Sequence, residues 1–191
     1  MSSSKRKIET ILSSTSSDNV FEYKRRGQTV PKDVVSVQFH QSVIEVGMNE
    51  VDDVAFRNCK QLREVILNKG LQMIGNSAFS GCHSLQSVNI PSTVTKIGLG
   101  AFSDCTGLNE IVLKDGLKIE SSAFAYCSSL KSIAIPSTVD EISSCVFMNC
   151  VRLRELVLRE GVKRIKGGAF QNCKSLQRIT IPSTVIEIDQ H

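Results

Sequence analysis

The 191-residue chain has no tryptophan, and only 5% of its residues are aromatic. Six of its eight phenylalanines recur at one position of an internal repeat, so few aromatic rings remain for the outer surface. Base stacking on single-stranded nucleic acid and the aromatic hot spots of protein interfaces both need exposed rings. The composition therefore argues against a stacking platform for nucleic acid.

Long hydrophobic runs are also absent. No stretch approaches the roughly 18 apolar residues of a membrane-spanning helix, and residues 1–14 lack the apolar core, roughly 7 to 15 residues long, of a secretory signal. The odd number of cysteines, seven, suits a reducing compartment in which thiols stay free. We therefore expect an intracellular, cytoplasmic protein with no membrane partner.

A strong excess of one charge is missing as well. The net charge is +4, and residues 1–33 hold seven Lys or Arg against four acids, which leaves 16 against 15 for the rest. Binding to a phosphate backbone needs clustered Lys and Arg, so nucleic acid is not an expected partner of the repeats. Lys5, Arg6 and Lys7 leave a nuclear import signal open, but a solvated run of charge is the simpler interpretation, since informative basic patches have about five to eight residues.

The residue types that usually carry catalysis form no constellation. His40, His83 and His191 fall at unrelated positions of the repeat, and no nucleophile or acid-base pair recurs near them. Gly98-x-Gly100 lacks the rest of any phosphate-binding fingerprint. We expect a protein that is not an enzyme and has no cofactor.

Six of the cysteines occur once per repeat, 22 or 23 residues apart. Metal-binding cysteines typically lie two to four residues apart, so no metal is expected. Stacked coils would bring the thiols near bridging distance, but we favour buried thiols that fill the core as small apolar groups. Cys145 stands where other coils have Ser77 or Ser122, which leaves open an exposed, reactive thiol or a tolerated substitution.

A Phe-x-x-Cys core recurs six times, at intervals of 23 residues and once of 22. Its members are Phe56 and Cys59, Phe79 and Cys82, Phe102 and Cys105, Phe124 and Cys127, Phe147 and Cys150, and Phe170 and Cys173. A fixed period of about 20 to 29 residues is typical of solenoids, whose coils bury their apolar faces against one another. Phe, Cys and the next Leu are three apart, which predicts a 3₁₀-like or helical turn with all three side chains in the core.

Each coil from Leu62 onward begins with an apolar-x-x-apolar-x-apolar segment. The six segments are residues 62–67, 85–90, 108–113, 130–135, 153–158 and 176–181. Alternation of β-branched residues predicts strands, with Val88 and Ile90 inside and Ser87 and Asn89 outside. We therefore expect a β-rich solenoid with a short-stranded parallel sheet, and short turns or 3₁₀ segments on the other side.

The turns after these segments alternate between two types. Three end in glycine at positions 70, 116 and 161, and three contain Pro-Ser-Thr at 91–93, 136–138 and 182–184. Glycine permits positive φ, whereas proline restricts φ and has no N–H. The repeating unit is thus a pair of coils, about 46 residues long. The return segment, such as Val94-x-x-Ile97, is open between turn and strand, and one coil is a residue shorter, at Leu117-Lys118-Ile119.

Three regions follow from these patterns. Residues 1–19 are rich in Ser and charge and are expected to form a mobile leader. Residues 20–61 are expected to form an N-terminal capping segment with an irregular first coil, because five additional residues fall between Val46 and Ala55. Residues 62–191 hold the repeats with no evident C-terminal cap, which suggests end-to-end self-association through the last coil or an incomplete gene product.

The stretch LQSVNIPSTVTKIGLGAFSDC, residues 85–105, resembles the BspA-type leucine-rich repeat, and the resemblance covers about four fifths of the chain. It is less similar to ordinary leucine-rich repeats, whose ladder Asn or Cys is replaced here by Gly70, Thr93, Gly116, Thr138, Gly161 and Thr184. We expect Thr hydroxyls to satisfy the turn backbone in alternate coils. The resemblance implies a curved, right-handed solenoid that recognises proteins.

The outward residues of the predicted strands form the candidate binding face. In every second coil a Glu stands beside an apolar residue, and these six are Glu64, Ile66, Glu110, Val112, Glu155 and Val157. They suit an extended basic or amphipathic peptide, although a solvated face with its charge offset by Arg63 and Arg154 is the alternative. We expect a non-enzymatic protein-interaction scaffold with a protein or peptide partner; a self-associating structural or adhesive module is the second hypothesis.

Overall fold

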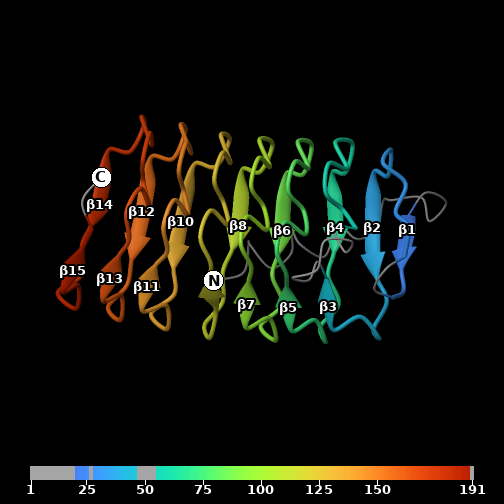
Figure 1. The fold of residues 1–191 in the computed structure, drawn as a ribbon, viewed down its shortest axis with the longest axis horizontal. Coiled ribbons are helices and arrows are strands. Elements are labelled where there is room, and N and C mark those ends of the chain that lie inside the picture. The colour runs from blue at the N-terminus through green and yellow to red at the C-terminus, as the bar shows by residue number, and fades with distance from the viewer. Residues whose placement is uncertain (1–19, 26–27, 47–54, 190–191) are drawn as a thin grey trace, which may run out of the picture.

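The computed structural model describes residues 20–25, 28–46 and 55–189. Within these ranges the chain winds as a stack of coils, and every strand pair is parallel (Figure 1). The predicted β-rich solenoid is therefore confirmed. The predictions for residues 1–19 and for the extra residues after Val46 fall outside the described residues.

The first column of strands contains the predicted apolar-x-apolar segments. It consists of β1 (Val20–Tyr23), β2 (Ser36–Phe39), β4 (Glu64–Ile66), β6 (Ser87–Asn89), β8 (Glu110–Val112), β10 (Ser132–Ile135), β12 (Glu155–Leu158) and β14 (Arg178–Thr180). Strand β1 pairs with β2 along its whole length and so adds a layer before the first repeat. Tyr23 of β1 packs on Phe39 and Phe56 with ring centroids 5.1 and 5.0 Å apart, and it covers the start of the aromatic column.

The return segments form a second column of two-residue strands, which settles the choice between turn and strand. Its members are β3 (Glu45–Val46), β5 (Met73–Ile74), β7 (Lys96–Ile97), β9 (Lys118–Ile119), β11 (Glu141–Ile142), β13 (Arg164–Ile165) and β15 (Glu187–Ile188). The first column occupies one half of the stack and the second column the other (Figure 1). Each coil therefore presents two strand faces to solvent.

The Phe-x-x-Cys segments form the third side of each coil, as consecutive turns. The N–H of Cys105 donates to the carbonyl of Phe102 at 3.2 Å, and the N–H of Leu108 donates to the carbonyl of Cys105 at 2.9 Å. Asp104, between them, has φ of 60°, in the left-handed region, so the segment cannot continue as a 3₁₀ helix. The Phe, Cys and Leu side chains all point into the core, as predicted.

The core is built on a column of stacked phenylalanines. From Phe56 to Phe147 the side chains are fully buried, and neighbouring rings stack with centroids 5.2 to 5.7 Å apart. Phe170 continues the column at 6.2 Å but is only partly buried. Each ring thus contacts the equivalent ring of the coils before and after it, which ties the coils together along the whole repeat.

Threonine hydroxyls satisfy the turn backbone, as expected. Thr93 donates from Oγ1 to the carbonyls of Lys69 and Leu71, at 2.9 and 2.6 Å. Thr138 and Thr184 accept from the glycine N–H of the preceding coil, at 2.7 and 3.0 Å, and Thr184 Oγ1 also donates to the carbonyl of Val162 at 2.8 Å. The ladder role that Asn or Cys has in ordinary repeats is therefore divided between Thr of one coil and Gly of its neighbour.

Both strand columns are interrupted at one coil boundary. The first column stops pairing after β8 and resumes at β10, and the second stops after β9 and resumes at β11. We call this boundary the seam. The shortened coil at Leu117 borders it, whereas the turn side stays bonded, since the N–H of Phe124 donates to the carbonyl of Val146 at 3.0 Å. The seam is thus open only along the strands. The first column has another break between β4 and β6.

Candidate interaction surfaces

The first column exposes alternate residues because a strand points successive side chains to opposite faces. Burial in β8 and β12 follows this rule: Ile111 and Leu156 are buried, while the residues on either side of them are exposed. All six predicted site residues lie on the outer surface, which we call the long-strand face. Glu64 is half-buried there, and the others are exposed. Ile66, Val112 and Val157 keep 36, 43 and 42% of their accessible area.

Strand register places the six residues in two rows. Glu64 lies opposite Ser36, Glu110 opposite Ser87, and Glu155 opposite Ser132. In the second row, Val112 lies opposite Asn89 and Val157 opposite Ala134. Two strand spacings amount to about 10 Å, which sets the approximate interval between carboxylates two coils apart. The breaks between β4 and β6 and between β8 and β10 fall between the three Glu, so pairing does not fix this interval.

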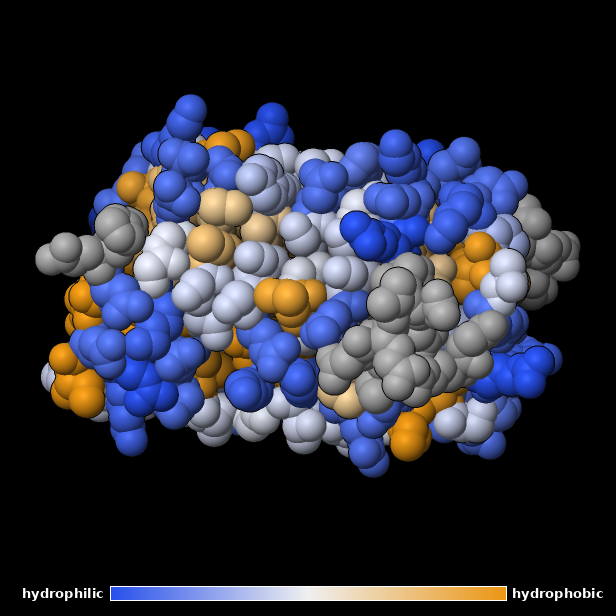
Figure 2. Space-filling model, viewed as in Figure 1, coloured by the Kyte–Doolittle hydropathy of each residue, from blue (hydrophilic) through white to orange (hydrophobic). Residues whose placement is uncertain are grey.

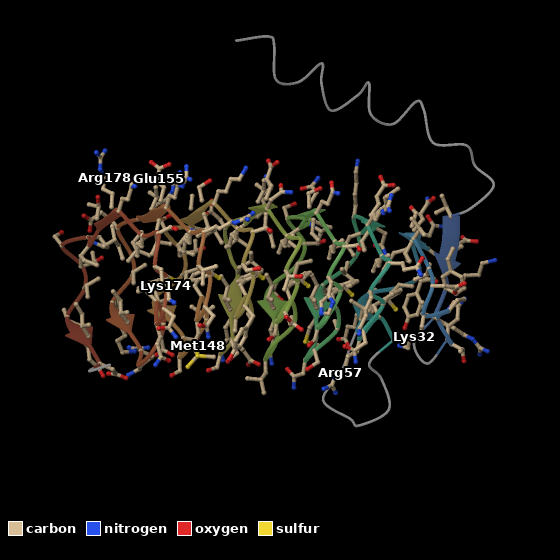
Figure 3. The ribbon with its side chains drawn as sticks, turned by 90° about the horizontal axis from the view of Figure 1, so that it is seen from above. Lys32, Arg57, Met148, Glu155, Lys174 and Arg178 are labelled. Carbon is tan, nitrogen blue, oxygen red and sulfur yellow. The ribbon has the colours of Figure 1, made fainter. Side chains whose placement is uncertain are left out.

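The carboxylates of the long-strand face form no ion pair in the described part of the chain. Glu64 accepts a hydrogen bond from Ser36 at 3.3 Å, and Arg63 and Arg154 form no ion pair with Glu64 or Glu155. Figure 3 shows Glu155 and its register neighbour Arg178 projecting side by side from this face. If Arg63 and Arg154 offset the negative charge of this face, they do so without a direct ion pair to Glu64 or Glu155.

A second organised surface, the short-strand face, was missed in the sequence. Cation and carboxylate side chains meet there across coil boundaries: Lys96 with Glu120 at 3.0 Å, Arg164 with Glu141 at 2.9 Å, and Lys166 with Glu187 at 2.8 Å. The hydrogen bond to Glu187 raises the pKa of Lys166. Opposite charges one period apart were visible in the sequence, but they become informative only when the return segments are known to be strands.

The exposed hydrophobic residues of the candidate site, Ile66, Val112 and Val157, lie in separate coils. Figure 2 shows hydrophobic residues among polar ones, including some at the end formed by β14 and β15. Ile186 and Ile188 are the most exposed isoleucines there, with 80 and 60% of their accessible area. They are the surface that the predicted end-to-end association would use.

The cysteine column is buried from Cys59 to Cys150, as predicted, and partly buried at Cys173, and its thiols also make hydrogen bonds. Each thiol from Cys82 to Cys173 donates to the carbonyl of the Phe one coil earlier, at 3.0 to 3.3 Å. Burial raises the pKa of Cys105 and of Cys150 to about 12. These thiols therefore stay protonated, which suits a donor and disfavours a nucleophile or a metal ligand.

Cys145 lies apart from this column and is partly buried. Its backbone has φ of 55°, and its thiol donates to the carbonyl of Gly167 at 3.9 Å, a long contact. Equivalent positions are Ser77, Gly100 and Ser122, which also have positive φ. The position thus selects residues that tolerate the left-handed region, and Cys145 is an unusual occupant.

The described residues lack two features, a cluster of metal ligands and a membrane-spanning helix. No group of three or more His, Cys, Asp and Glu side chains is placed to hold a metal ion in these residues. The same part of the chain has no helix with the length and apolar character needed to cross a membrane.

The repeats show which known family the chain belongs to. The family described as BspA type Leucine rich repeat region matches in six copies, over residues 34–153 and 117–191. The chain belongs to this BspA-type family. No curated protein matches the chain. Leucine-rich repeat proteins are generally non-enzymatic scaffolds and typically serve as protein-interaction or surface modules.

Crystal structures of three bacterial proteins are similar to the BspA-type chain. A leucine-rich repeat protein of T. pallidum is 29% identical with a TM-score of 0.71, and the match covers 82% of this chain and 72% of that one. A leucine-rich cell surface protein of Faecalibacterium prausnitzii is 28% identical with a TM-score of 0.69, over 91% of this chain and 44% of that one. A leucine-rich repeat protein of Eubacterium ventriosum is 26% identical with a TM-score of 0.72, over 84 and 43%. The chain thus spans less than half the length of the last two.

Proposed function

We propose that this BspA-type chain is a non-enzymatic protein-interaction scaffold, and that its long-strand face binds an extended basic or amphipathic segment of a partner protein. The observation that carries the proposal is the pair of parallel rows on that face. Within the described residues Glu64, Glu110 and Glu155 form no ion pair, and apolar side chains stand beside them.

The chemistry of the rows determines what would fit. A segment lying across the coils meets a carboxylate and an apolar group about every 10 Å. Lys or Arg at matching intervals would pair with the carboxylates, and apolar residues between them would cover Ile66, Val112 and Val157. Partly buried charge pairs give orientation and specificity, and the apolar contacts contribute most of the affinity.

The test is affinity capture with a face variant and a matched control. Replacing Glu110 and Val112 by Lys should abolish capture of the partner, because it reverses one charge and removes one apolar contact at the centre of the face. The control variant, Leu99→Lys with Asp115→Lys, makes the same chemical change at exposed positions outside the strands. Capture that is unchanged in the face variant, or lost equally in both, would exclude the long-strand face.

A structural or adhesive module is the second candidate, because one of the similar structures is a cell surface protein and because Ile186 and Ile188 are exposed. This function predicts self-association that is lost when both isoleucines are replaced by Lys. Sedimentation of the wild type as a monomer at high concentration would contradict it. A cytoplasmic location stays a prediction, which cell fractionation can test.

A further inference from the structure

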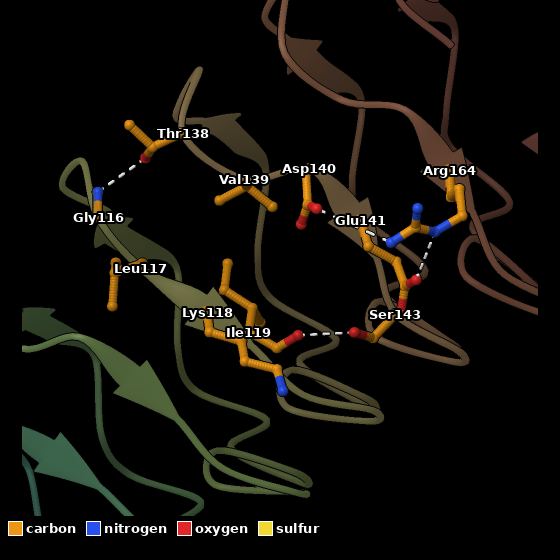
Figure 4. A pocket seen from close by; sticks show the side chains of 10 residues that line it. All are labelled: Gly116, Leu117, Lys118, Ile119, Thr138, Val139, Asp140, Glu141, Ser143 and Arg164. Atoms are coloured by element: carbon orange, nitrogen blue, oxygen red, sulfur yellow. Dashed lines mark hydrogen bonds and ion pairs between the residues drawn. The ribbon is translucent and has the colours of Figure 1, made fainter. Parts of the chain in front are cut away.

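The seam contains a cleft on the short-strand face that the interaction rows do not use. Its volume is about 460 Å³ (Figure 4), within the roughly 300 to 1,000 Å³ of small-ligand sites. Leu117, Lys118 and Ile119 form one wall, and the other contains Val139, Asp140 and Glu141. A smaller hollow of about 260 Å³ lies at the same boundary, beside the turns that follow β8 and β10.

The missing residue of the shortened coil explains the cleft. In the other coils one residue separates the apolar residue after the turn from the return strand, as Thr95 separates Val94 from Lys96. In the shortened coil this residue is missing, and Leu117 is followed directly by Lys118. Lys118 therefore makes the hydrogen bond to the preceding coil that the missing residue would make. Its N–H donates to the carbonyl of Thr95 at 2.8 Å. Strand β9 is held against β7, and β11 is left without a partner on this side.

Backbone groups on both walls lack the hydrogen bonds that their equivalents make. One coil later, Lys163 and Lys166 donate to the carbonyls of Asp140 and Ile142, at 2.7 and 2.9 Å. The matching N–H groups, just before and just after β11, belong to Asp140 and Ser143. Neither donates to the backbone of β9, and the carbonyl of Leu117 accepts no hydrogen bond in the described structure.

Side chains join the two coils at both ends of the cleft. The N–H of Gly116 donates to Thr138 Oγ1 at 2.7 Å, and Ser143 Oγ donates to the carbonyl of Ile119 at 2.7 Å (Figure 4). These contacts limit the unsatisfied stretch to about three strand residues, or roughly 10 Å. The cleft is therefore a short slot, open toward solvent between two fixed ends.

We propose that this cleft binds a short extended peptide segment of about three residues, whose backbone makes the hydrogen bonds that β9 and β11 do not make with each other. Such a ligand must offer donors and acceptors at strand spacing, as a peptide backbone does. The buried Leu117, Ile119 and Val139 form an apolar floor for a small apolar side chain.

The charges at the rim favour a peptide over a simple ion. Lys118 and Arg164 are balanced by Asp140 and Glu141, and Arg164 is already 2.9 Å from Glu141. A phosphate or carboxylate would meet two acidic groups, and a metal ion would meet two cations. The proposal does not depend on the long-strand face, because the cleft belongs to the other strand column.

Nuclear magnetic resonance of the ¹⁵N-labelled full chain tests the proposal, with a capped Val-Thr-Val tripeptide as the probe. The probe should shift the amide signals of residues 117–119 and 139–143 and slow the hydrogen exchange of Asp140 and Ser143. The same tripeptide with N-methylated amides should shift these signals much less, because it cannot donate. No shift with the capped probe, or an equal shift with the N-methylated probe or with acetate, would overturn the proposal.

A matched variant restores the period. Insertion of one Thr between Leu117 and Lys118 reproduces the Val94-Thr95-Lys96 pattern and should close the cleft. We expect Asp140 and Ser143 to be protected from exchange without probe, and the tripeptide to cause no shift. Binding that persists in a folded insertion variant with protected amides contradicts the proposal. If the variant does not fold, the comparison of the two probes on the wild type still decides.

Discussion

At the scale of single residues, the cysteine column shows what a repeated position selects. A small apolar side chain would fill the space beside each Phe, but Ala or Val would not bond the Phe carbonyl of the preceding coil. Each column thiol after Cys59 fills that space and also donates, at 3.0 to 3.3 Å. Thiols are weak donors, so the gain per coil is small, but it recurs at every boundary of the column.

This arrangement predicts sensitivity to alkaline pH. An ordinary thiol titrates near 9.0, whereas burial raises the pKa of Cys105 to about 12. Above pH 9 the unfolded chain loses this proton and the folded chain keeps it, so stability is complete below pH 9 and falls as the pH rises toward 12. Each such thiol costs about 1.4 kcal/mol per pH unit.

Urea unfolding at several pH values, with Cys105→Ala as the comparison, measures the effect. The variant should be less stable than the wild type at pH 8, and the difference in unfolding free energy should shrink by pH 10.5. Lys and Tyr titrate in the same range in both proteins, so only the difference is informative. A difference that stays constant with pH would show that Cys105 does not titrate with the expected shift.

The sequence predicted the column but not its hydrogen bonds. Spacing by three residues placed Phe102, Cys105 and Leu108 in the core, because a tight turn leaves no other arrangement. The hydrogen bond from each thiol depends on the distance between successive coils along the solenoid, which is set by the packing of the whole repeat. No pattern within a single copy encodes it.

At the scale of elements, the first strand column was predictable and the second was not. Strands such as β8 have alternating apolar residues, and this alternation is visible over three or four positions. A two-residue strand such as β7 has no alternation to detect, since Lys96 and Ile97 fit a turn equally well. The outward orientation of the six candidate residues could therefore be predicted, and their role in binding stays a prediction, while the ion pairs and cleft of the other face were missed.

The glycine turns give a prediction that separates backbone strain from crowding. Gly116 and Gly161 occupy the same position of the pair of coils, and both have positive φ, 82° and 126°. A Cβ on Gly161 would overlap the carbonyl oxygen of Ser137, whereas a Cβ on Gly116 would meet no atom within 4 Å.

Alanine at the two positions should therefore have different costs. Gly116→Ala is expected to lower the free energy of unfolding by about 1 to 2 kcal/mol, the cost of a left-handed conformation with a Cβ. Gly161→Ala should cost clearly more, because the backbone of Ser137 must also move. Chemical denaturation of both variants gives the comparison, and equal losses would show that the coil at Gly116 is packed as closely as the one at Gly161.

At the scale of the whole molecule, stability is approximately a sum over coils and the contacts between neighbours. The seam has the fewest of these contacts among the second-column boundaries, because no strand pairing joins β9 to β11. The phenylalanine stack and the turn bonds still cross it, with Phe124 and Phe147 5.7 Å apart. The contact between the two coils at the seam is therefore weakened but not lost.

Hydrogen exchange in mild denaturant should reveal two cooperative units. Amides of β4 to β9 should lose protection together, and amides of β10 to β15 should lose it together at a different denaturant concentration. The insertion of Thr after Leu117, which restores the strand ladder, should merge the two transitions. A single midpoint for all protected amides of the wild type would contradict a division at the seam.

The shortened coil has a consequence for how such arrays change over time. Loss of one amino acid leaves the copy that carries it folded, and its effect appears at the junction with the next copy, where a crevice forms. A tandem array can thus acquire a recognition site by deletion alone, without any new side chain. Among proteins built from near-identical units, the places where the count of residues slips would then be the first positions to search for binding.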